Sequence, residues 1–204
     1  MKKVLIDCGT NLCQGLGKIS EFFGVDDSWE VWSFEANTNT FNVVDHKSYP
    51  HVNFVNKAVW IDDSIRTLDS EVWEGEIHKK NGFNIKADTI TDSVVGGGTN
   101  IMGDEFLFPN SKTENIRKNF QDIQCFDFSS FIKEKFNEKD LIVVKMDIEG
   151  AEYPVLEKMI TDDSLKFIKH LFVEWHNPML KTQWNQQRIV EEINKLNIKL
   201  YNWD

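Results

Sequence analysis

The sequence predicts an α/β fold with a mostly parallel sheet that is covered by helices on both faces. Short apolar runs recur along the chain without the alternation of a half-exposed strand, as expected for strands that are buried on both faces. Segments with helical periodicity follow several of these runs. The length of 204 residues and the 41% of hydrophobic residues suit one domain with a full-sized core.

The first part of the chain predicts a β-α-β-α-β unit. Residues 3–6 form a short apolar run that ends in the turn sequence Asp7-Cys8-Gly9, and residues 16–23 predict the helix that follows. The segments 29–35 and 51–60 are rich in β-branched and aromatic residues, so each predicts a strand, with room for a helix between them.

The last third of the chain repeats this alternation. We expect strands at 141–146, 170–175 and 198–203, and helices at 153–160 and 184–196, with Pro154 in the first turn of its helix. Residues 61–125 break the rhythm and predict hairpins and a mobile loop. The run from Gly96 to Asn100 within them is either a flexible turn or a loop that covers a ligand.

Composition excludes several partners and compartments. The 33 acidic and 23 basic residues give a net charge of -10, which disfavours binding to nucleic acid or to an anionic membrane. Cys8, Cys13 and Cys125 are odd in number, and no apolar stretch reaches the roughly 18 residues of a membrane span. We therefore expect a reduced, cytoplasmic protein with a single domain over residues 1–204, which can also be a module of a larger chain.

The carboxyl ends of parallel strands are where ligands bind, and polar residues follow the first two predicted strands. Asp7, Gly9, Thr10 and Asn11 come after the first strand; glycine lets the backbone approach a ligand, and Asp7 can accept a hydrogen bond from a cationic amine. Glu35 follows the second strand and can accept from both hydroxyls of a ribose. Together these residues predict a nucleoside-containing cofactor, although each alone is also ordinary turn chemistry.

The turn after the first strand lacks the GxGxxG pattern that binds a pyrophosphate. A cofactor without phosphate fits better, and S-adenosylmethionine is one. Its ammonium suits Asp7, its ribose suits Glu35, and Asn56, Lys57 and Ala58 after the third strand would flank its adenine.

Acidic residues crowd the end of the strand at 141–146. Asp147, Glu149 and Glu152 lie within six residues, and Glu174 and His176 follow the next strand at a spacing that directs both to one side. Helix capping would explain part of the cluster, since carboxylates are stabilised at a helix N-terminus, and a lone histidine is often structural. Their shared position at the sheet's carboxyl edge favours a functional role.

Three blocks, LIDCGTN, SFEANT and VVKMDIEGAEYPVLEKM, resemble the FkbM-type family of S-adenosylmethionine-dependent methyltransferases. The resemblance implies a Rossmann-like class I methyltransferase fold and methyl transfer to an oxygen, often a sugar hydroxyl. Matching positions place Asp7, Gly9 and Asn11 in the cofactor turn, Glu35 at the ribose, and Asp147, Glu149, Gly150 and Glu152 in the signature turn. Thr10, Ala36 and Asn37 lie in the same blocks and are expected at the cofactor.

We therefore expect an O-methyltransferase that acts on a sugar hydroxyl of a glycan or glycosylated metabolite. A deoxyhexose such as rhamnose would suit an acidic, aromatic-lined pocket, because it carries both hydroxyls and an apolar methyl edge. Two alternatives stay open: a nicotinamide-dependent oxidoreductase, which shares the strand-glycine-strand-acid pattern, and a catalytically inactive cofactor-binding module.

A sugar hydroxyl is a poor nucleophile at neutral pH, so a base or a cation must activate it. We expect Mg²⁺ or Mn²⁺ on Asp147, Glu174 and His176, with Glu149 close by, because oxygen ligands with one imidazole suit these ions. Asp147, Glu149 and His176 are then the catalytic candidates. In the metal-free alternative, His176 or Glu149 is the general base and positioning does the rest.

Overall fold

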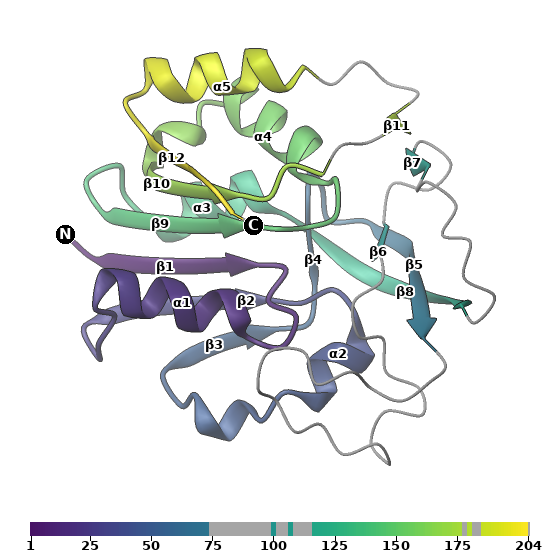
Figure 1. The fold of residues 1–204 in the computed structure, drawn as a ribbon. Helices are drawn as coiled ribbons and strands as arrows, with labels where there is room; N and C mark the ends of the chain where they lie inside the picture. The colour runs from purple at the N-terminus through teal and green to yellow at the C-terminus, as the bar shows by residue number, and fades with distance from the viewer. Residues whose placement is uncertain (74–98, 101–105, 108–115, 177–178, 181–184, 204) are drawn as a thin grey trace.

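The computed structural model describes residues 1–73, 99–100, 106–107, 116–176, 179–180 and 185–203. Its centre is a six-stranded sheet in the order β12-β10-β9-β1-β2-β3, and every neighbouring pair in it is parallel (Figure 1). The strands are β1 (Lys3–Cys8), β2 (Trp29–Phe34), β3 (Val52–Val55), β9 (Leu141–Met146), β10 (Ile168–Val173) and β12 (Lys199–Asn202). The predicted Rossmann-like α/β fold is confirmed.

The strand order reverses at the centre of the sheet. From β1 the chain moves outward through β2 to β3, and it later returns to β9 on the other side of β1 and moves outward through β10 to β12. The chain leaves β1 and β9 toward helices on opposite faces of the sheet, and we call the carboxyl edge between these two strands the crevice, because open α/β sheets bind ligands at such a point. This crevice is where the sequence places its candidate residues.

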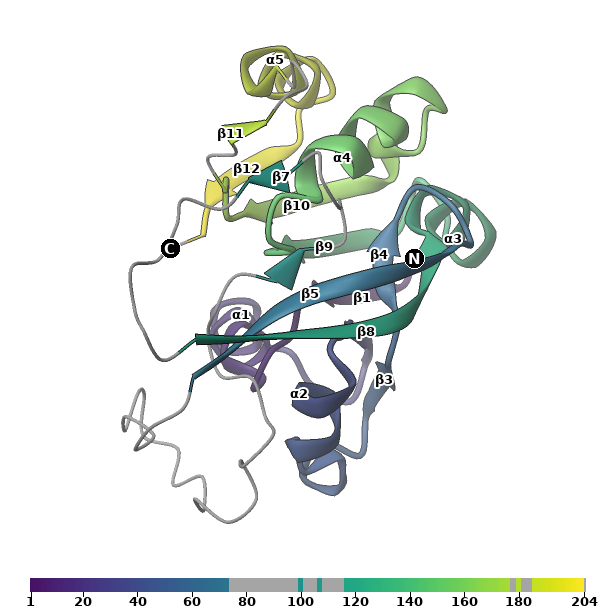
Figure 2. The ribbon, with the colours of Figure 1, turned by 90° about the vertical axis from the view of Figure 1, so that its right-hand side faces the viewer.

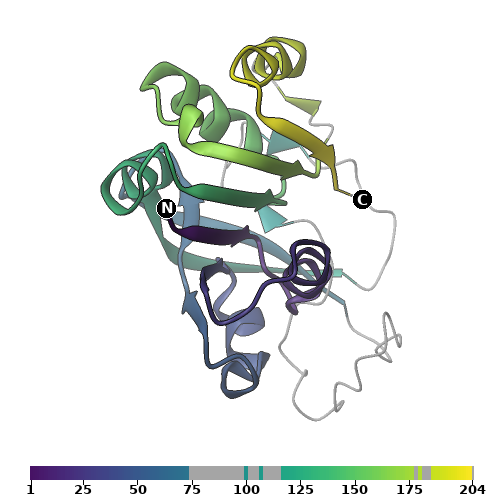
Figure 3. The ribbon, with the colours of Figure 1, turned by 90° about the vertical axis from the view of Figure 1, so that its left-hand side faces the viewer.

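Helices cover both faces of the sheet, and alternate residues of β1 point to the two sides. Leu5 packs with Leu16 and Ile19 of α1 (Gln14–Phe23) on one face. Val4 and Ile6 belong to the core that the other helices cover, which are α3 (Phe128–Lys135), α4 (Glu152–Thr161) and α5 (Gln186–Lys195) (Figure 3). The central strands β1, β9 and β10 are mostly buried between these layers, which explains their largely apolar sequences.

Side-chain caps fix where several helices begin. Asn37 accepts hydrogen bonds from the backbone amides of Asn39 and Thr40 at the start of α2 (Thr38–Val43). Asp127 and Asn185 accept in the same way from Ser130 and Arg188, at the starts of α3 and α5. Helix α3 was not among the predicted elements, although Asp127 is the type of residue that begins a helix.

A second sheet stands beyond the carboxyl ends of β1 and β9 (Figures 1 and 2). Its order is β4-β8-β5-β6, with β4 (Ala58–Trp60), β5 (Ile65–Trp73), β6 (Thr99–Asn100) and β8 (Ile116–Asp127). Strand β5 pairs with β8 in antiparallel fashion, but residues 74–115 separate the two strands, so this pair is not one of the hairpins expected within residues 61–125. A short pair, β7 (Phe106–Leu107) with β11 (Met179–Leu180), completes the strands described.

The single strand predicted at 51–60 is wrong. Strand β3 ends at Val55, whose carbonyl accepts from the amides of Glu35 and Lys57, and the Asn56 side chain donates to the carbonyls of Glu35 and Ala36. These bonds turn the chain away, so that β4 begins at Ala58 and pairs with β8 in the second sheet. β-Propensity alone did not reveal this break.

Other observed element boundaries differ from the predicted ones by a few residues. Strand β1 continues through Asp7 and Cys8, so Asp7 lies in the strand and not in the turn after it. Strand β10 ends at Val173, so Glu174 and His176 lie beyond it. Helix 184–196 corresponds to α5, whereas Trp184 and the glycines 96–98 lie outside the described residues.

The three cysteines are free and buried. Among the helices that the structure describes, each is too short or too polar to cross a bilayer.

The turn after β1 allows a sharp stability test. Gly9 has φ +77°, and a Cβ on it would lie 1.8 Å from the carbonyl oxygen of Asp147. Gly9→Ala should therefore lower the free energy of unfolding by about 3 kcal/mol or more, as measured by urea denaturation. Gly17→Ala is the matched control, because a Cβ there meets nothing within 4 Å inside α1, and should raise stability by about 0.5–1 kcal/mol. Equal effects of the two substitutions would contradict this account of Gly9.

Candidate functional site

Glu35 joins the turns that follow β1 and β2. Its Oε2 accepts a hydrogen bond of 2.8 Å from the amide of Asn11, and its Oε1 accepts one of 2.8 Å from the amide of Asn37. Each carboxylate oxygen has a further lone pair. Glu35 therefore shapes the predicted cofactor turn and keeps acceptor capacity for a ligand.

The other residues predicted at the cofactor divide into two groups. Asn11, Ala36 and Lys57 are partly or fully exposed at the carboxyl edge of the sheet. Thr10, Asn37 and Ala58 are buried. Of these residues, only the first group has surface that a ligand at this edge could contact.

Each buried residue has a structural partner. The Thr10 hydroxyl lies 2.5 Å from that of Ser33 in β2, and Ala58 belongs to a core cluster with Trp60. Asn37 caps α2 and also accepts from the Gln121 side chain in β8, at 3.0 Å. Gln121 in turn lies 3.4 Å from the amide of Thr38, so this contact attaches the second sheet to the cofactor edge.

Asp7 has no exposed surface. It stands beside Lys145 in the β1–β9 register, and its Oδ1 lies 3.3 Å from the Lys145 ammonium. The cationic amine that faces Asp7 is therefore one that the chain itself provides. Burial lowers the pKa of Lys145, but the carboxylates of Asp7 and Asp147 outweigh it and raise that pKa above its ordinary value. The lysine is charged at neutral pH.

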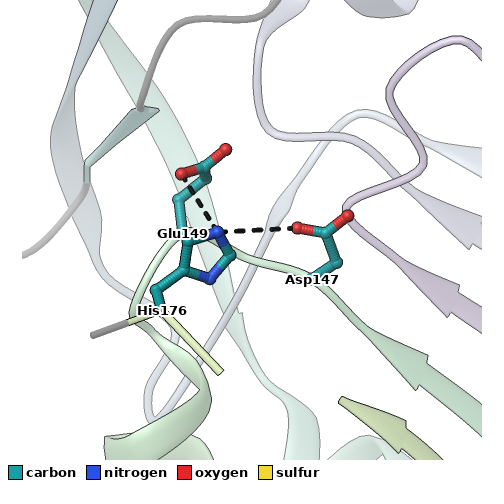
Figure 4. Close-up of side chains that lie close together, drawn as sticks. All are labelled: Asp147, Glu149 and His176. Atoms are coloured by element: carbon teal, nitrogen blue, oxygen red, sulfur yellow. Dashed lines mark ion pairs between the residues drawn. The ribbon is translucent and has the colours of Figure 1, made fainter. Parts of the chain in front are cut away.

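His176 stands at the centre of the acidic cluster (Figure 4). Its Nε2 lies 3.3 Å from Glu149, 3.9 Å from Asp147 and 3.8 Å from Glu174. The expectation that Glu174 and His176 share one side of the crevice agrees with this geometry. Four carboxylates surround one imidazole when Glu152 is included, and its oxygen lies 3.1 Å from Nδ1.

Two consecutive residues of α4 hold His176. Glu152 is fully buried, and its Oε1 accepts from the amide of Ile148 at 2.7 Å and faces His176 Nδ1. The Tyr153 hydroxyl donates to the carbonyl of His176 at 3.0 Å. With its Nδ1–H directed to Glu152, the imidazole presents Nε2 to Asp147 and Glu149.

The cluster changes the protonation of its own members. Burial lowers the pKa of His176, but Glu152, Glu149 and Asp147 outweigh it and raise that pKa to about 9. Burial raises the pKa of Glu149 to about 7, with Asp147 and Glu152 adding to the shift and His176 opposing it. Without another cation, His176 is an imidazolium at neutral pH, and Glu149 is near the midpoint of its titration.

The backbone of the signature turn is left-handed at two successive positions. Glu149 has φ +56° and Gly150 has φ +96°. A non-glycine residue in this region is uncommon, and such residues gather where a side chain must be aimed at a site. Here the conformation turns Glu149 toward His176.

Asp147, Glu149 and His176 form a group that could hold a metal ion. Each offers one ligand atom, and these atoms lie within 4.8 Å of one another. The set differs from the predicted Asp147, Glu174 and His176 in one member, because the turn at Glu149 brings that side chain closer to Nε2 than Glu174.

Sequence reasoning assigned no role to Lys145, and for Glu152 it weighed helix capping against a functional role without naming a partner. Both are buried charged residues, and both contact a site residue. The signal for Lys145 was a charge inside an otherwise apolar strand, which is unusual for a strand covered on both faces. For Glu152, nothing in the sequence distinguished a cap from a partner of His176.

Comparison with known families identifies the chain. The family model of the methyltransferase FkbM domain matches residues 7–200, so the chain belongs to this family and is a methyltransferase. No curated protein and no solved structure matched the chain.

Glu152→Gln tests how His176 is held. Loss of this carboxylate should lower the pKa of His176 from about 9 toward the ordinary imidazole value, because the strongest interaction that favours its charged form is removed. An NMR titration of the imidazole measures this. Glu174→Gln is the control and should change the pKa less, since its carboxylate is 3.8 Å away and partly exposed. A pKa that stays near 9 in Glu152→Gln would show that the other carboxylates suffice.

Proposed function

We propose that this FkbM-domain methyltransferase uses S-adenosylmethionine to methylate a sugar hydroxyl, with a divalent cation bound at Asp147, Glu149 and His176. The observation that carries the proposal is the position of the His176 cluster. It lies at the carboxyl end of β9, next to the crevice where β1 and Glu35 would hold a cofactor.

The hydrogen-bonding groups at the cofactor turn suit S-adenosylmethionine. Glu35 is held by two backbone amides and retains lone pairs for ribose hydroxyls, as the carboxylate after the second strand does in nucleoside-binding α/β folds. The turn residues Gly9, Thr10 and Asn11 lack the glycine pattern of a pyrophosphate site. This favours a phosphate-free nucleoside cofactor over a nicotinamide dinucleotide, as does membership of a methyltransferase family.

The ligand set suits Mn²⁺ or Mg²⁺ because it combines two carboxylates with one imidazole. Asp147 and Glu149 would supply oxygen ligands, and His176 would supply Nε2 while Glu152 holds its Nδ1–H. Glu174 borders the same space. When bound, the cation would lower the pKa of the acceptor hydroxyl, and S-adenosylmethionine would supply an electrophilic methyl group.

The metal-free alternative now favours Glu149 over His176 as the base. A histidine with a pKa of about 9 is protonated at neutral pH and cannot accept a proton there. Glu149, with a pKa of about 7, is matched to that task. In this alternative His176 acts as the counter-charge that keeps the acids together.

The charge of the site favours a neutral acceptor. Four carboxylates face one imidazole, and the chain as a whole carries a net charge of -10, so a phosphorylated or carboxylated acceptor would be repelled in the absence of a cation. A sugar hydroxyl fits this environment, and a deoxyhexose such as rhamnose remains our proposed acceptor within a glycan.

Glu35→Ala tests the cofactor. The affinity for S-adenosylhomocysteine, measured by calorimetry, should fall by about 1.5–3 kcal/mol, the value of a bidentate hydrogen bond to a charged group. Glu30→Ala is the control, because it removes a carboxylate from the amino end of the same strand, where Glu30 pairs with Lys2, and should leave the affinity unchanged. Binding that survives Glu35→Ala would move the ribose elsewhere, and binding of NADH alone would exclude methyl transfer from S-adenosylmethionine.

Removal of metal tests the second part of the proposal. Methyl transfer to a panel of hydroxylated glycans should be lost after exhaustive EDTA treatment and should return with Mn²⁺ or Mg²⁺ in the wild type, because the cation activates the hydroxyl. Asp147→Ala and His176→Ala should not recover. Full activity in EDTA would favour Glu149 as base, whereas cofactor binding without transfer to any acceptor would favour an inactive binding module.

A further inference from the structure

Lys145 is a lysine inside the core, with only 2% of its surface exposed. It is the fifth residue of β9, between Asp7 of β1 and Phe172 of β10, on the face that α1 covers. An ammonium in such a place is costly unless anions and acceptors surround it. The contacts of Lys145 are therefore informative.

The Lys145 ammonium contacts three groups: one in strand β1, one in the turn after β1 and one in the turn after β9. Its Nζ lies 3.3 Å from Asp7 Oδ1 and 3.2 Å from Asp147 Oδ2, and it donates to the carbonyl of Gly9 at 2.7 Å. A role in neutralising the buried Asp7 carboxylate would explain only the contact with Asp7. The other two join the turn after β1 to the turn after β9.

The contact with Asp147 fixes how that carboxylate faces the site. Its Oδ2 is held by Lys145, which leaves Oδ1 directed toward His176 Nε2 at 3.9 Å. The two oxygens are thus divided between the core and the crevice. Without the ammonium, the carboxylate could rotate and offer either oxygen or both.

The fold also reserves space for this side chain. A Cβ on Gly15, near the start of α1, would lie 3.1 Å from Lys145 Cε and 3.3 Å from the ring of Trp203. The ammonium stands over the same ring, 5.9 Å from its centroid. The helix therefore approaches Lys145 as closely as it does because residue 15 is glycine.

We propose that Lys145 is a positioning residue that sets the cofactor turn and Asp147 in one fixed arrangement. It holds the Gly9 carbonyl on one side and Asp147 Oδ2 on the other, and its 2% exposure leaves almost no surface for a ligand to contact. This inference rests on the proposed function in so far as the two turns are the cofactor turn and the catalytic turn.

A charge-balanced double variant separates positioning from simple charge pairing. Lys145→Met alone leaves Asp7 buried without its cation and should lower the melting temperature strongly. Asp7→Asn with Lys145→Met removes both charges, so much of the lost melting temperature should return. The affinity for S-adenosylhomocysteine should remain at least tenfold weaker than in the wild type. Hydrogen exchange should be faster in peptides that contain residues 9–13 and 147–151.

Gly15→Ala provides a second measurement in a protein that keeps every charge. The new methyl group should displace Lys145 by a few tenths of an ångström and weaken S-adenosylhomocysteine binding several-fold without loss of melting temperature. Gly17→Ala, with open space around its Cβ, should bind as the wild type does.

The outcomes separate the two proposals. A double variant with restored melting temperature, wild-type affinity and wild-type exchange would overturn the positioning role, and so would Gly15→Ala with unchanged affinity. A wild type that does not bind S-adenosylhomocysteine would instead overturn the proposed cofactor, and the exchange measurement would still decide whether Lys145 orders the two turns.

Discussion

The close contact between the turns after β1 and β9 is the constraint on which the rest of the site depends. The amide of Asp147 donates to the carbonyl of Cys8, and the carbonyl of Asp147 occupies the space where Gly9 would carry a side chain. We expected this glycine to let the backbone approach a ligand, but what it admits in the structure is the neighbouring turn. The cofactor edge and the acidic cluster are thereby joined directly, and neither can shift without the other.

Charge balance is the second constraint on the site, and it differs between the interior of the sheet and the crevice. Inside the sheet, Lys145 pairs with the fully buried Asp7, and its ammonium also reaches the partly exposed Asp147 in the turn after β9. At the crevice, His176 faces four carboxylates with one imidazole, and the excess is negative. Lys145 and Asp7 balance each other, whereas Asp147 adds to the negative excess around His176, and this excess raises the pKa of His176.

Much of the sheet could be predicted from the sequence. Leu141–Met146 was recognised with its observed boundaries because an apolar run without alternation, interrupted only by Lys145, indicates a strand covered on both faces. The position of Glu35, Asp147 and His176 at one edge followed from the rule that parallel strands end together. Propensity failed at Asn56, where side-chain bonds to Glu35 and Ala36 divide one β-rich run between two sheets.

The details of the site lay beyond the sequence because they depend on which atoms meet. Glu149 and Glu174 are equivalent as residue types, and only the left-handed backbone at Glu149 brings it nearer to His176. The sequence analysis placed Asp7 in the turn after β1 and expected it to bind a ligand. In the structure, β1 extends by two residues to Cys8, and Asp7 is buried beside Lys145. Strand register decided the second outcome and turn conformation the first, and both are properties of the assembled fold.

The position of β1 between β2 and β9 also has a consequence for how the protein is made. Strand β1 leaves the ribosome before its partner β9, which follows more than 130 residues later, as the bond between Lys2 and Asp140 illustrates. Until then Asp7 lacks its lysine and one edge of β1 lacks a neighbour. Contacts of such long range slow folding. An unfinished chain therefore exposes an apolar strand edge and a buried-type carboxylate, so the nascent protein depends on prompt completion of its carboxyl-terminal half.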